Sequence, residues 1–411
     1  MARWMLQVCL VIGCAFAQDP STATADRVDQ STRASQIESA REQKAAALEP
    51  DKPQGVEHAL DVFEEKEFLQ RFSEGIAGFR VHLGGLITGS GFAAGPEYYR
   101  HLLHDRVTFR ASLRASLRKY YLMDAELSAP HLAQDHAFVN LYAVHYDYPD
   151  MDYYGPGSNS KKTGRSDFLL ENTQFEFRGG IQPVNHLRLG ALGKYLMENV
   201  SQGRDDGFAS ATQIYSEQST PGLEYQSNFL QGGGFIQYDW RDSAGGPRSG
   251  GNYLAEFSDF SDVRRHAYAF DELHLEAQQY IPFFNRRRVI ALRGRVLATD
   301  PHAGNLVPFY LQPTLGGSDD LRGYRAFRFY DNNSLLLNGE YRWEVFSGLD
   351  MALFVDAGQV FDRWQQINFR RLDTDYGFGF RFNVHNDVIL RIDTGFSSEG
   401  FAIWFKFNNV F

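Results

Sequence analysis

Residues 107–118 alternate strictly between apolar and polar side chains. The odd positions, from Val107 to Leu117, are all apolar, and the even positions are Thr, Ser or Arg. Successive side chains of a strand point to opposite faces, so the segment predicts a strand with one apolar face and one face that carries arginines. In a soluble sandwich the apolar face would meet a second sheet. In a membrane barrel Phe109 and Leu113 would face lipid, while Arg110 and Arg114 would line the lumen.

Ten further segments show the same period of two. They are residues 168–178, 186–197, 229–241, 273–282, 288–299, 335–346, 349–360, 376–384, 388–396 and 401–411. Short turns such as 347–348 alternate with long polar connections at 148–166, 201–227 and 300–333, which is typical of outer-membrane barrels. No internal stretch has 18 consecutive apolar residues, so the sequence excludes transmembrane helices.

The pattern predicts an all-β fold, a transmembrane antiparallel β-barrel over residues 78–411. We expect 14–16 strands: fourteen can be placed from the pattern, and residues 105–129 form either one long strand or two. The family resemblance described below is what favours 16. The barrel is expected to lie in the bacterial outer membrane, surrounded by its lipids and lipopolysaccharide.

The last strand alternates large apolar residues and ends on an aromatic one. Phe405, Phe407 and Phe411 lie on the face that we expect to point outward, and Lys406 lies on the lumen face. In a soluble protein these side chains would be exposed beside an unprotected edge, which invites aggregation. The strand is similar to the signal by which the barrel assembly machinery recognises outer-membrane barrels.

Composition agrees with strands at a membrane. The chain has 411 residues with 34 Phe, 21 Tyr and 38 Gly, and aromatic residues are favoured in strands and at membrane interfaces. The net charge of −10 argues against a nucleic-acid partner, because phosphate binding needs a basic surface.

The N-terminal region divides into three parts. Residues 1–17 have the basic start, apolar run and Ala15-Phe16-Ala17 ending of a signal peptide, although Val11–Cys14 also resembles a lipoprotein box in which Cys14 would carry lipid. Residues 18–56 contain no aromatic residue and predict a disordered periplasmic linker. Residues 57–77 predict a short amphipathic helix and a lead-in to the barrel.

Residues 316–330 read GGSDDLRGYRAFRFY and combine loop-forming residues with three arginines and several aromatics. If this loop entered the lumen, its arginine would need partners, because a buried unpaired charge is very costly. Glu340 and Asp356 occupy polar-facing positions of two neighbouring predicted strands, and carboxylates match the fork of an arginine.

Leu321-Arg322-Gly323-Tyr324 resembles the arginine-glycine-aromatic motif in the long sixth extracellular loop of the BamA-like superfamily, the bacterial surface antigen family. Residues 354–358 are similar to the family's strand motif, and residues 238–250 and 153–157 resemble two further family patterns. The resemblance implies a 16-stranded outer-membrane barrel with this loop folded into its lumen. The implied residues that hold the loop are Arg322, Gly323, Tyr324, Glu340, Asp356 and Gly358.

Assembly factors and translocators of that superfamily carry POTRA domains before the barrel, and residues 18–77 show no β-α-α-β-β pattern. We therefore expect a barrel without POTRA domains that inserts or translocates protein or lipid through a loop-gated lumen. A passive diffusion channel or a structural barrel is the alternative. An outer-membrane lipid hydrolase would need a Ser/His pair at the rim, which the sequence does not identify.

Enzyme motifs are absent from the sequence: it has no G-x-S-x-G elbow, no P-loop and no C-x-x-C pair. We expect no catalytic residue, cofactor or resident metal. His131, Asp135 and His136 share a turn, where solvation is favoured over metal binding. An acidic loop formed by Asp147, Asp150 and Asp152 would be a cation site or an ordinary polar loop.

Overall fold

A computed structural model describes residue 43 and residues 78–384 and 387–407. The expected signal peptide, linker and helix, apart from Gln43, lie outside the described residues, and so does Phe411. No helix within the described part is long and apolar enough to cross a membrane.

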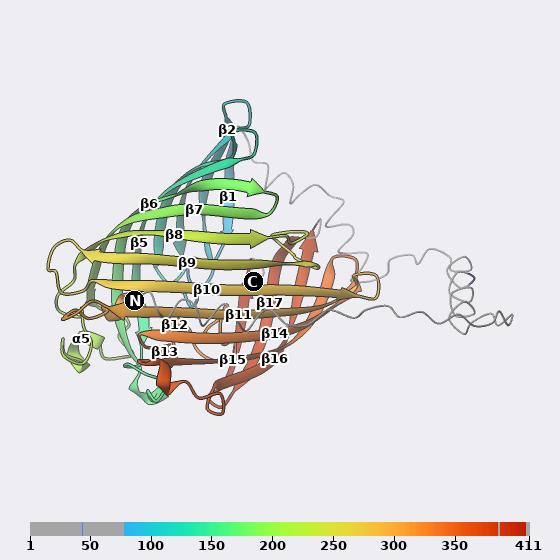
Figure 1. Ribbon diagram of the computed structural model, residues 1–411. Helices are drawn as coiled ribbons and strands as arrows, with labels where there is room; N and C mark the ends of the chain where they lie inside the picture. The colour runs from blue at the N-terminus through green and yellow to red at the C-terminus, as the bar shows by residue number, and fades with distance from the viewer. Residues whose placement is uncertain (1–42, 44–77, 385–386, 408–411) are drawn as a thin grey trace, which may run out of the picture. The chain divides into compact units, whose positions relative to one another are not determined.

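Sixteen strands form one antiparallel sheet, which Figure 1 shows as a single curved wall. Each strand pairs with its sequence neighbours, except that β11 pairs with β14 across a long loop. The strands are β1 (Phe79–Gly84), β2 (Ala93–Leu102), β3 (Val107–Ser116), β4 (Tyr121–Leu132), β5 (Ala137–Tyr153), β6 (Ser166–Val184), β7 (Leu187–Gln202), β8 (Asn228–Asp239), β9 (Gly250–Asp262), β10 (Phe270–Phe283), β11 (Arg288–Pro301), β14 (Asn333–Phe346), β15 (Leu349–Phe361), β16 (Asp373–Val384), β17 (Asp387–Ser397) and β18 (Gly400–Lys406). The expected all-β antiparallel barrel with 16 strands is therefore confirmed.

The remaining elements are short and lie in the connections. They are η1 (Lys162–Gly164), α5 (Ala211–Ile214), η2 (Phe309–Leu311), η3 (Trp364–Gln366) and a two-stranded sheet of β12 (Thr314–Leu315) and β13 (Phe329–Tyr330). Long and short connections lie at opposite ends of the wall because the strands are antiparallel. The long ones include 203–227 and 302–332, and the short ones include 133–136 and 347–348.

The strands that the sequence analysis missed break the simple alternation. Residues 105–129 form parts of two strands, β3 and β4, joined by a tight turn. Residues 148–153 were expected in a loop, which was wrong: β5 continues to Tyr153 and absorbs Pro149 in a bulge between Tyr148 and Met151. β9 was missed because its inward face mixes Ser258 with Phe260, so neither face is uniformly apolar.

Side chains alternate across the wall as the sequence pattern predicts. Leu113 is 54 % exposed and Phe405 is 65 % exposed on the outer face. On the inner face Arg110 and Arg114 each reach the buried Asp124 at 3.0 Å. Lys406 likewise points inward, to Asp319 at 3.1 Å. The outer face is thus apolar and the lumen is charged, as in a membrane barrel.

The two ends of the sheet meet at a seam. Among the described residues no backbone ladder joins β1 to β18. The strands come together where Gly84, the last residue of β1, lies against the side chain of Phe407, which follows β18. The rings of Phe92 and Phe407 are 5.8 Å apart. Because β1 and β18 run in opposite directions, most of β18 extends past the end of β1, and its outer edge is not covered by that strand.

Candidate functional site

The loop between β11 and β14 packs against the inner face of the wall. Leu315, Leu321, Tyr324 and Phe329 of this loop form a buried cluster with residues of β14 and β15. The loop's apolar side chains therefore have partners inside the barrel, which explains why a polar loop sequence carries so many of them.

Arg322 lies at the centre of this docked loop and is fully buried. Its Nε and Nη2 donate to the two carboxylate oxygens of Asp356 on β15, at 2.8 and 2.9 Å. Its Nη1 donates to Oε2 of Glu340 on β14 at 2.6 Å. The guanidinium also lies 3.5 Å from the ring centroid of Phe354. The carboxylates of Asp356 and Glu340 therefore bind its N–H groups, while the ring of Phe354 covers its face.

The ion pair of Arg322 belongs to a larger buried network. Glu340 also accepts from Arg342 Nε at 2.8 Å and from Arg381 Nη2 at 3.0 Å. Asp393 on β17 bonds to Arg381 at 2.5 Å and lies 3.3 Å from Arg391. Charges of opposite sign thus alternate from β14 to β17, and this alternation lowers the cost of burying each one.

Arg342, Arg381, Arg391 and Asp393 were not predicted as site residues. The sequence carried a signal for them, since Arg342 is two positions from Glu340 and therefore on the same face of β14. Arg381, Arg391 and Asp393 also face the lumen from their strands. A search for charged residues on lumen-facing positions next to Glu340 and Asp356 would have found the network.

Close approach between loop and wall accounts for the two glycines. A Cβ on Gly323 would lie 2.6 Å from the Cβ of Asp375 on β16, and a Cβ on Gly358 would lie 2.9 Å from Leu315 of the loop. Tyr324 is buried, and its hydroxyl lies 3.3 Å from the hydroxyl of Ser398. Both glycines therefore allow contacts that a larger residue would block.

The docked loop also contacts the last strand, β18, and two other connections of the barrel. Trp404 of β18 donates its indole N–H to the carbonyl oxygen of Arg322 at 2.8 Å. Arg328 donates to Glu399, at 2.7–3.0 Å, and to the carbonyl oxygen of Ser160. The loop is therefore fixed to β14, β15, β18 and two other loops at the same time.

At the opposite end of the barrel the connection between β8 and β9 forms a second constriction. Asp242 accepts N–H groups of Ser243, Arg248 and Ser249, which folds residues 240–249 into a compact unit. Arg248 donates to both carboxylate oxygens of Asp350 on β15, at 2.9 and 2.7 Å. The N–H of Val388 on β17 donates to the carbonyl oxygen of Gly245, so this connection reaches strands far from its own.

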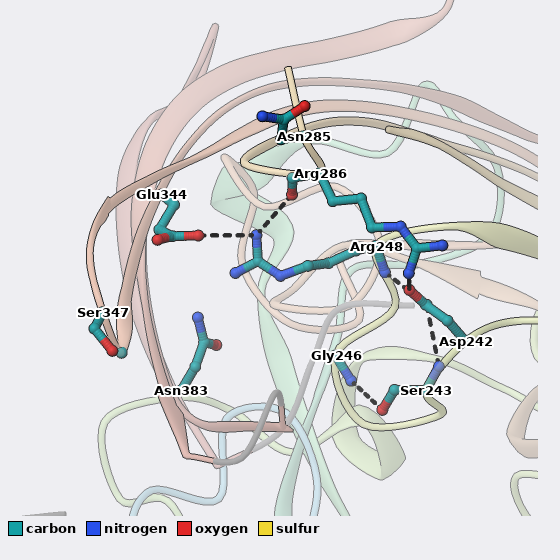
Figure 2. Close-up of a pocket in the computed structure, with 10 residues that line it drawn as sticks. Asp242, Ser243, Gly246, Arg248, Asn285, Arg286, Glu344, Ser347 and Asn383 are labelled. Carbon is teal, nitrogen blue, oxygen red and sulfur yellow. Dashed lines mark hydrogen bonds and ion pairs between the residues drawn. The ribbon is translucent and has the colours of Figure 1, made fainter. Parts of the chain in front are cut away.

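A cavity of about 550 Å³ lies beside this connection. Figure 2 shows the residues that line it. Arg248, Arg286, Glu344 and Asn383 line it, and Arg248 also donates to the carbonyl oxygen of Arg286. The constriction and the Arg322 network share one residue: Arg342 bonds to Glu340 and also lies 3.4 Å from the carbonyl oxygen of Pro247.

The structure does not gather the predicted metal ligands of either turn around one point. His131 contacts Asp135 at 2.9 Å on the surface, while His136 turns to backbone carbonyl groups. In the acidic loop Asp150 pairs with Arg118, and Asp152 pairs with Arg165. Within the described residues one other group has the donor types of a metal site, namely Asp259, Asp271 and His302.

Comparison with known proteins agrees with this architecture. The model of the Omp85 superfamily domain matches residues 99–385. A solved structure, BamA from Haemophilus ducreyi lacking POTRA domains 1–3, is similar with a TM-score of 0.58 and 14 % identity, over 80 % of this chain and 69 % of that one. CdiB from Escherichia coli is similar with a TM-score of 0.53 and 12 % identity, over 80 % of this chain and 62 % of that one.

The search of curated proteins found no match. The two structural likenesses establish the fold, and the family match spans most of the strands, from β2 to β16. The chain therefore belongs to the Omp85 superfamily, whose barrels reside in the bacterial outer membrane.

Proposed function

We propose that this barrel inserts or translocates protein or lipid at the outer membrane, and that the docked loop 302–332 gates its lumen. The observation that carries the proposal is the burial of Arg322 between Asp356 and Glu340, at 2.6–2.9 Å, on the inner wall.

A buried ion pair usually contributes no more to the stability of a fold than apolar packing of the same volume. Apolar residues of similar size often replace such a network at no cost in stability, whereas breaking one partner is strongly destabilising. If the loop leaves the wall, water can hydrate the charged side chains of this network, whereas an apolar plug would expose hydrophobic side chains to water. The Arg322 network therefore suits a loop that holds firmly when docked and leaves a hydrophilic wall when released.

The rest of the lumen supports passage of polar material. Arg178 pairs with Glu256, and Arg293 pairs with Glu276, on the inner faces of β6 to β11. These pairs make the inner face charged between the docked loop and residues 240–249, which lie toward opposite ends of the barrel. A structural barrel would need no such charged inner face, and a diffusion channel would need no lock across it.

The test uses the full chain reconstituted into phospholipid vesicles. One arm measures how fast a urea-unfolded small outer-membrane barrel folds into these vesicles, and the other measures how fast a fluorescent phospholipid crosses between leaflets. We expect the wild-type protein to accelerate at least one process. Arg322→Ala should change that rate, while Arg370→Ala, which removes an exposed arginine of another loop, should not.

Two results would reject the proposal. If vesicles with and without the protein behave alike in both arms, insertion and translocation are both wrong. If planar-bilayer recordings show a wide, steady pore in the wild-type protein that Arg322→Ala leaves unchanged, the protein is a passive diffusion channel.

A further inference from the structure

The three arginines of residues 316–330 have different surroundings. Arg322 is paired with Asp356 and Glu340, and Arg328 is paired with Glu399. Arg325 is exposed, and it pairs with no carboxylate in the part of the chain that the structure describes. Its position between two anchored arginines fixes its backbone, so the side chain starts from a defined place inside the barrel rather than from a free loop.

Arg325 lines a cavity of about 680 Å³ at the seam between β1 and β18. The outer wall of this cavity is apolar, with Phe92, Ile403, Phe405 and Phe407, which are all exposed on the lipid-facing side. Ser318 and Ala326 of the docked loop line the inner wall. The cavity thus connects the lipid-facing surface of β18 with the loop inside the barrel.

The charge of the cavity is positive although the chain as a whole is acidic. Its lining has four basic side chains, Arg118, Arg165, Arg325 and Lys406, and one carboxylate, Asp152. Three of the basic side chains have a partner within 3.1 Å: Arg118 has Asp150, Arg165 has Asp152 and Lys406 has Asp319. Arg325 therefore contributes the positive charge that remains uncompensated.

We propose that the seam cavity binds one anionic lipid, with its phosphate on Arg325 and an acyl chain along Phe92, Ile403 and Phe405. An arginine fork matches two phosphate oxygens, and the apolar outer wall suits a hydrocarbon chain. One molecule with both parts fits a site that is cationic inside and apolar toward the membrane. This inference goes beyond the proposed function, because a resident lipid requires no transport.

A polypeptide strand is the competing occupant, since the edge of β18 is not covered by β1. Strand addition would satisfy the backbone groups of that edge. It would leave Arg325 without an anion, however, and it would not explain why the cavity is cationic. The lipid satisfies both the charge and the apolar wall, so the observations favour it.

The experiment measures lipid binding to the purified full chain by native mass spectrometry. The probes are phosphatidylglycerol, phosphatidylcholine and soluble glycerol 3-phosphate. The phosphates of both lipids can reach Arg325, but the choline ammonium of phosphatidylcholine offsets its phosphate and is repelled by the uncompensated positive charge. We therefore expect one phosphatidylglycerol to bind about tenfold more tightly than phosphatidylcholine, a difference of about 1.4 kcal/mol. Arg325→Gln should remove this preference, Arg325→Lys should keep part of it, and the control Arg370→Gln should leave it unchanged.

Folding of each variant is checked by electrophoretic mobility before and after heating. The proposal is overturned if Arg325→Gln binds phosphatidylglycerol as the wild-type protein does, or if the two lipids bind equally. It is also overturned if glycerol 3-phosphate competes as well as the whole lipid, because the apolar wall would then contribute nothing. Displacement of phosphatidylglycerol from the wild-type protein by a peptide with the sequence of β1, which could pair with the open edge of β18, would assign the cavity to a polypeptide strand.

Discussion

Arg322 and Asp356 lie 34 positions apart in the sequence and meet inside the barrel through two side-chain hydrogen bonds of 2.8 and 2.9 Å. Both oxygens of the carboxylate and two nitrogens of the guanidinium take part, so the contact fixes the orientation of the loop as well as its position. Glu340 bonds to the third nitrogen.

Arg322→Ala should release the loop and raise the conductance of the barrel several-fold. Removing one partner of a buried ion pair costs about 3–5 kcal/mol, because the other charge stays buried and unpaired. Single-channel recording of the refolded protein measures the effect. Arg322→Lys should restore little, since lysine lacks the bidentate fork.

Asp356→Asn should reproduce the effect of Arg322→Ala, because both variants break the same contact. The double variant should be no more conductive than either single one, as expected for two residues that act together. Independent, additive effects of the two substitutions would show that the contact does not hold the loop.

Gly323→Ala should push the loop away from β16. The added methyl group would lie 2.6 Å from the Cβ of Asp375 and 2.9 Å from the backbone carbon of Phe396, and neither the backbone nor the short Asp375 side chain can give way easily. Limited proteolysis should therefore cut residues 302–332 faster in this variant. Gly232→Ala is the matched control, because its methyl group meets no atom within 4 Å; equal cleavage of both variants would contradict the prediction.

Arg248→Gln should have a small effect alone and a large effect together with Arg322→Ala. Arg248 holds residues 240–249 to Asp350, at the end of the barrel opposite the docked loop. The docked loop and residues 240–249 act as two resistances in series, with the docked loop as the larger one. The conductance of the double variant should therefore exceed the sum of the two single increases. Arg370→Gln, which removes an exposed arginine of another loop, serves as the control.

We expect the stability of the docked loop to depend on pH through the carboxyl group of Asp331. Burial raises the pKa of this loop carboxyl from 3.8 to about 6, although the N–H of Asn332 donates to it. A raised pKa in the docked state means that the stabilisation is complete below pH 3.8 and is lost as the pH rises through 6. Hydrogen exchange of residues 302–332 should accelerate between pH 4 and about 7, after correction for intrinsic rates. Asp331→Asn should flatten this change, and an unchanged slope in that variant would assign it to other groups.

The barrel itself was predictable because the alternation of each strand depends only on that strand's own sequence. Alternation along residues 107–118 or 401–407 requires only that one face meets lipid and the other meets water, and each strand reports this separately. The lipid-facing positions of Leu113 and Phe405 follow from that pattern, whereas the number of 16 strands was implied by the resemblance to the BamA-like superfamily. β2 and β9 escaped detection where glycine, proline or mixed side chains interrupt the alternation.

The site was predictable only in part, because its residues come together through register. The sequence pointed to Arg322, Glu340 and Asp356, which the structure places in contact. The contribution of Arg381 and Asp393 depends on how β14 to β17 align, and a period of two does not fix the alignment of neighbouring strands. The crossing of residues 240–249 to β15 and β17 is a contact between distant segments, for which the alternation carries no signal.

The anchors of the docked loop also bear on the order in which this chain folds. Glu340, Asp356, Ser397 and Trp404 belong to the last five strands of the sheet, and the loop directly precedes the first of them. The residues that bond to Arg322 therefore all follow it in the chain, and the two carboxylates lie only 18 and 34 positions away, a separation that favours fast formation. The C-terminal quarter of the protein can thus assemble as a nucleus around Arg322, and the preceding eleven strands can then close the wall around a loop that is already in place.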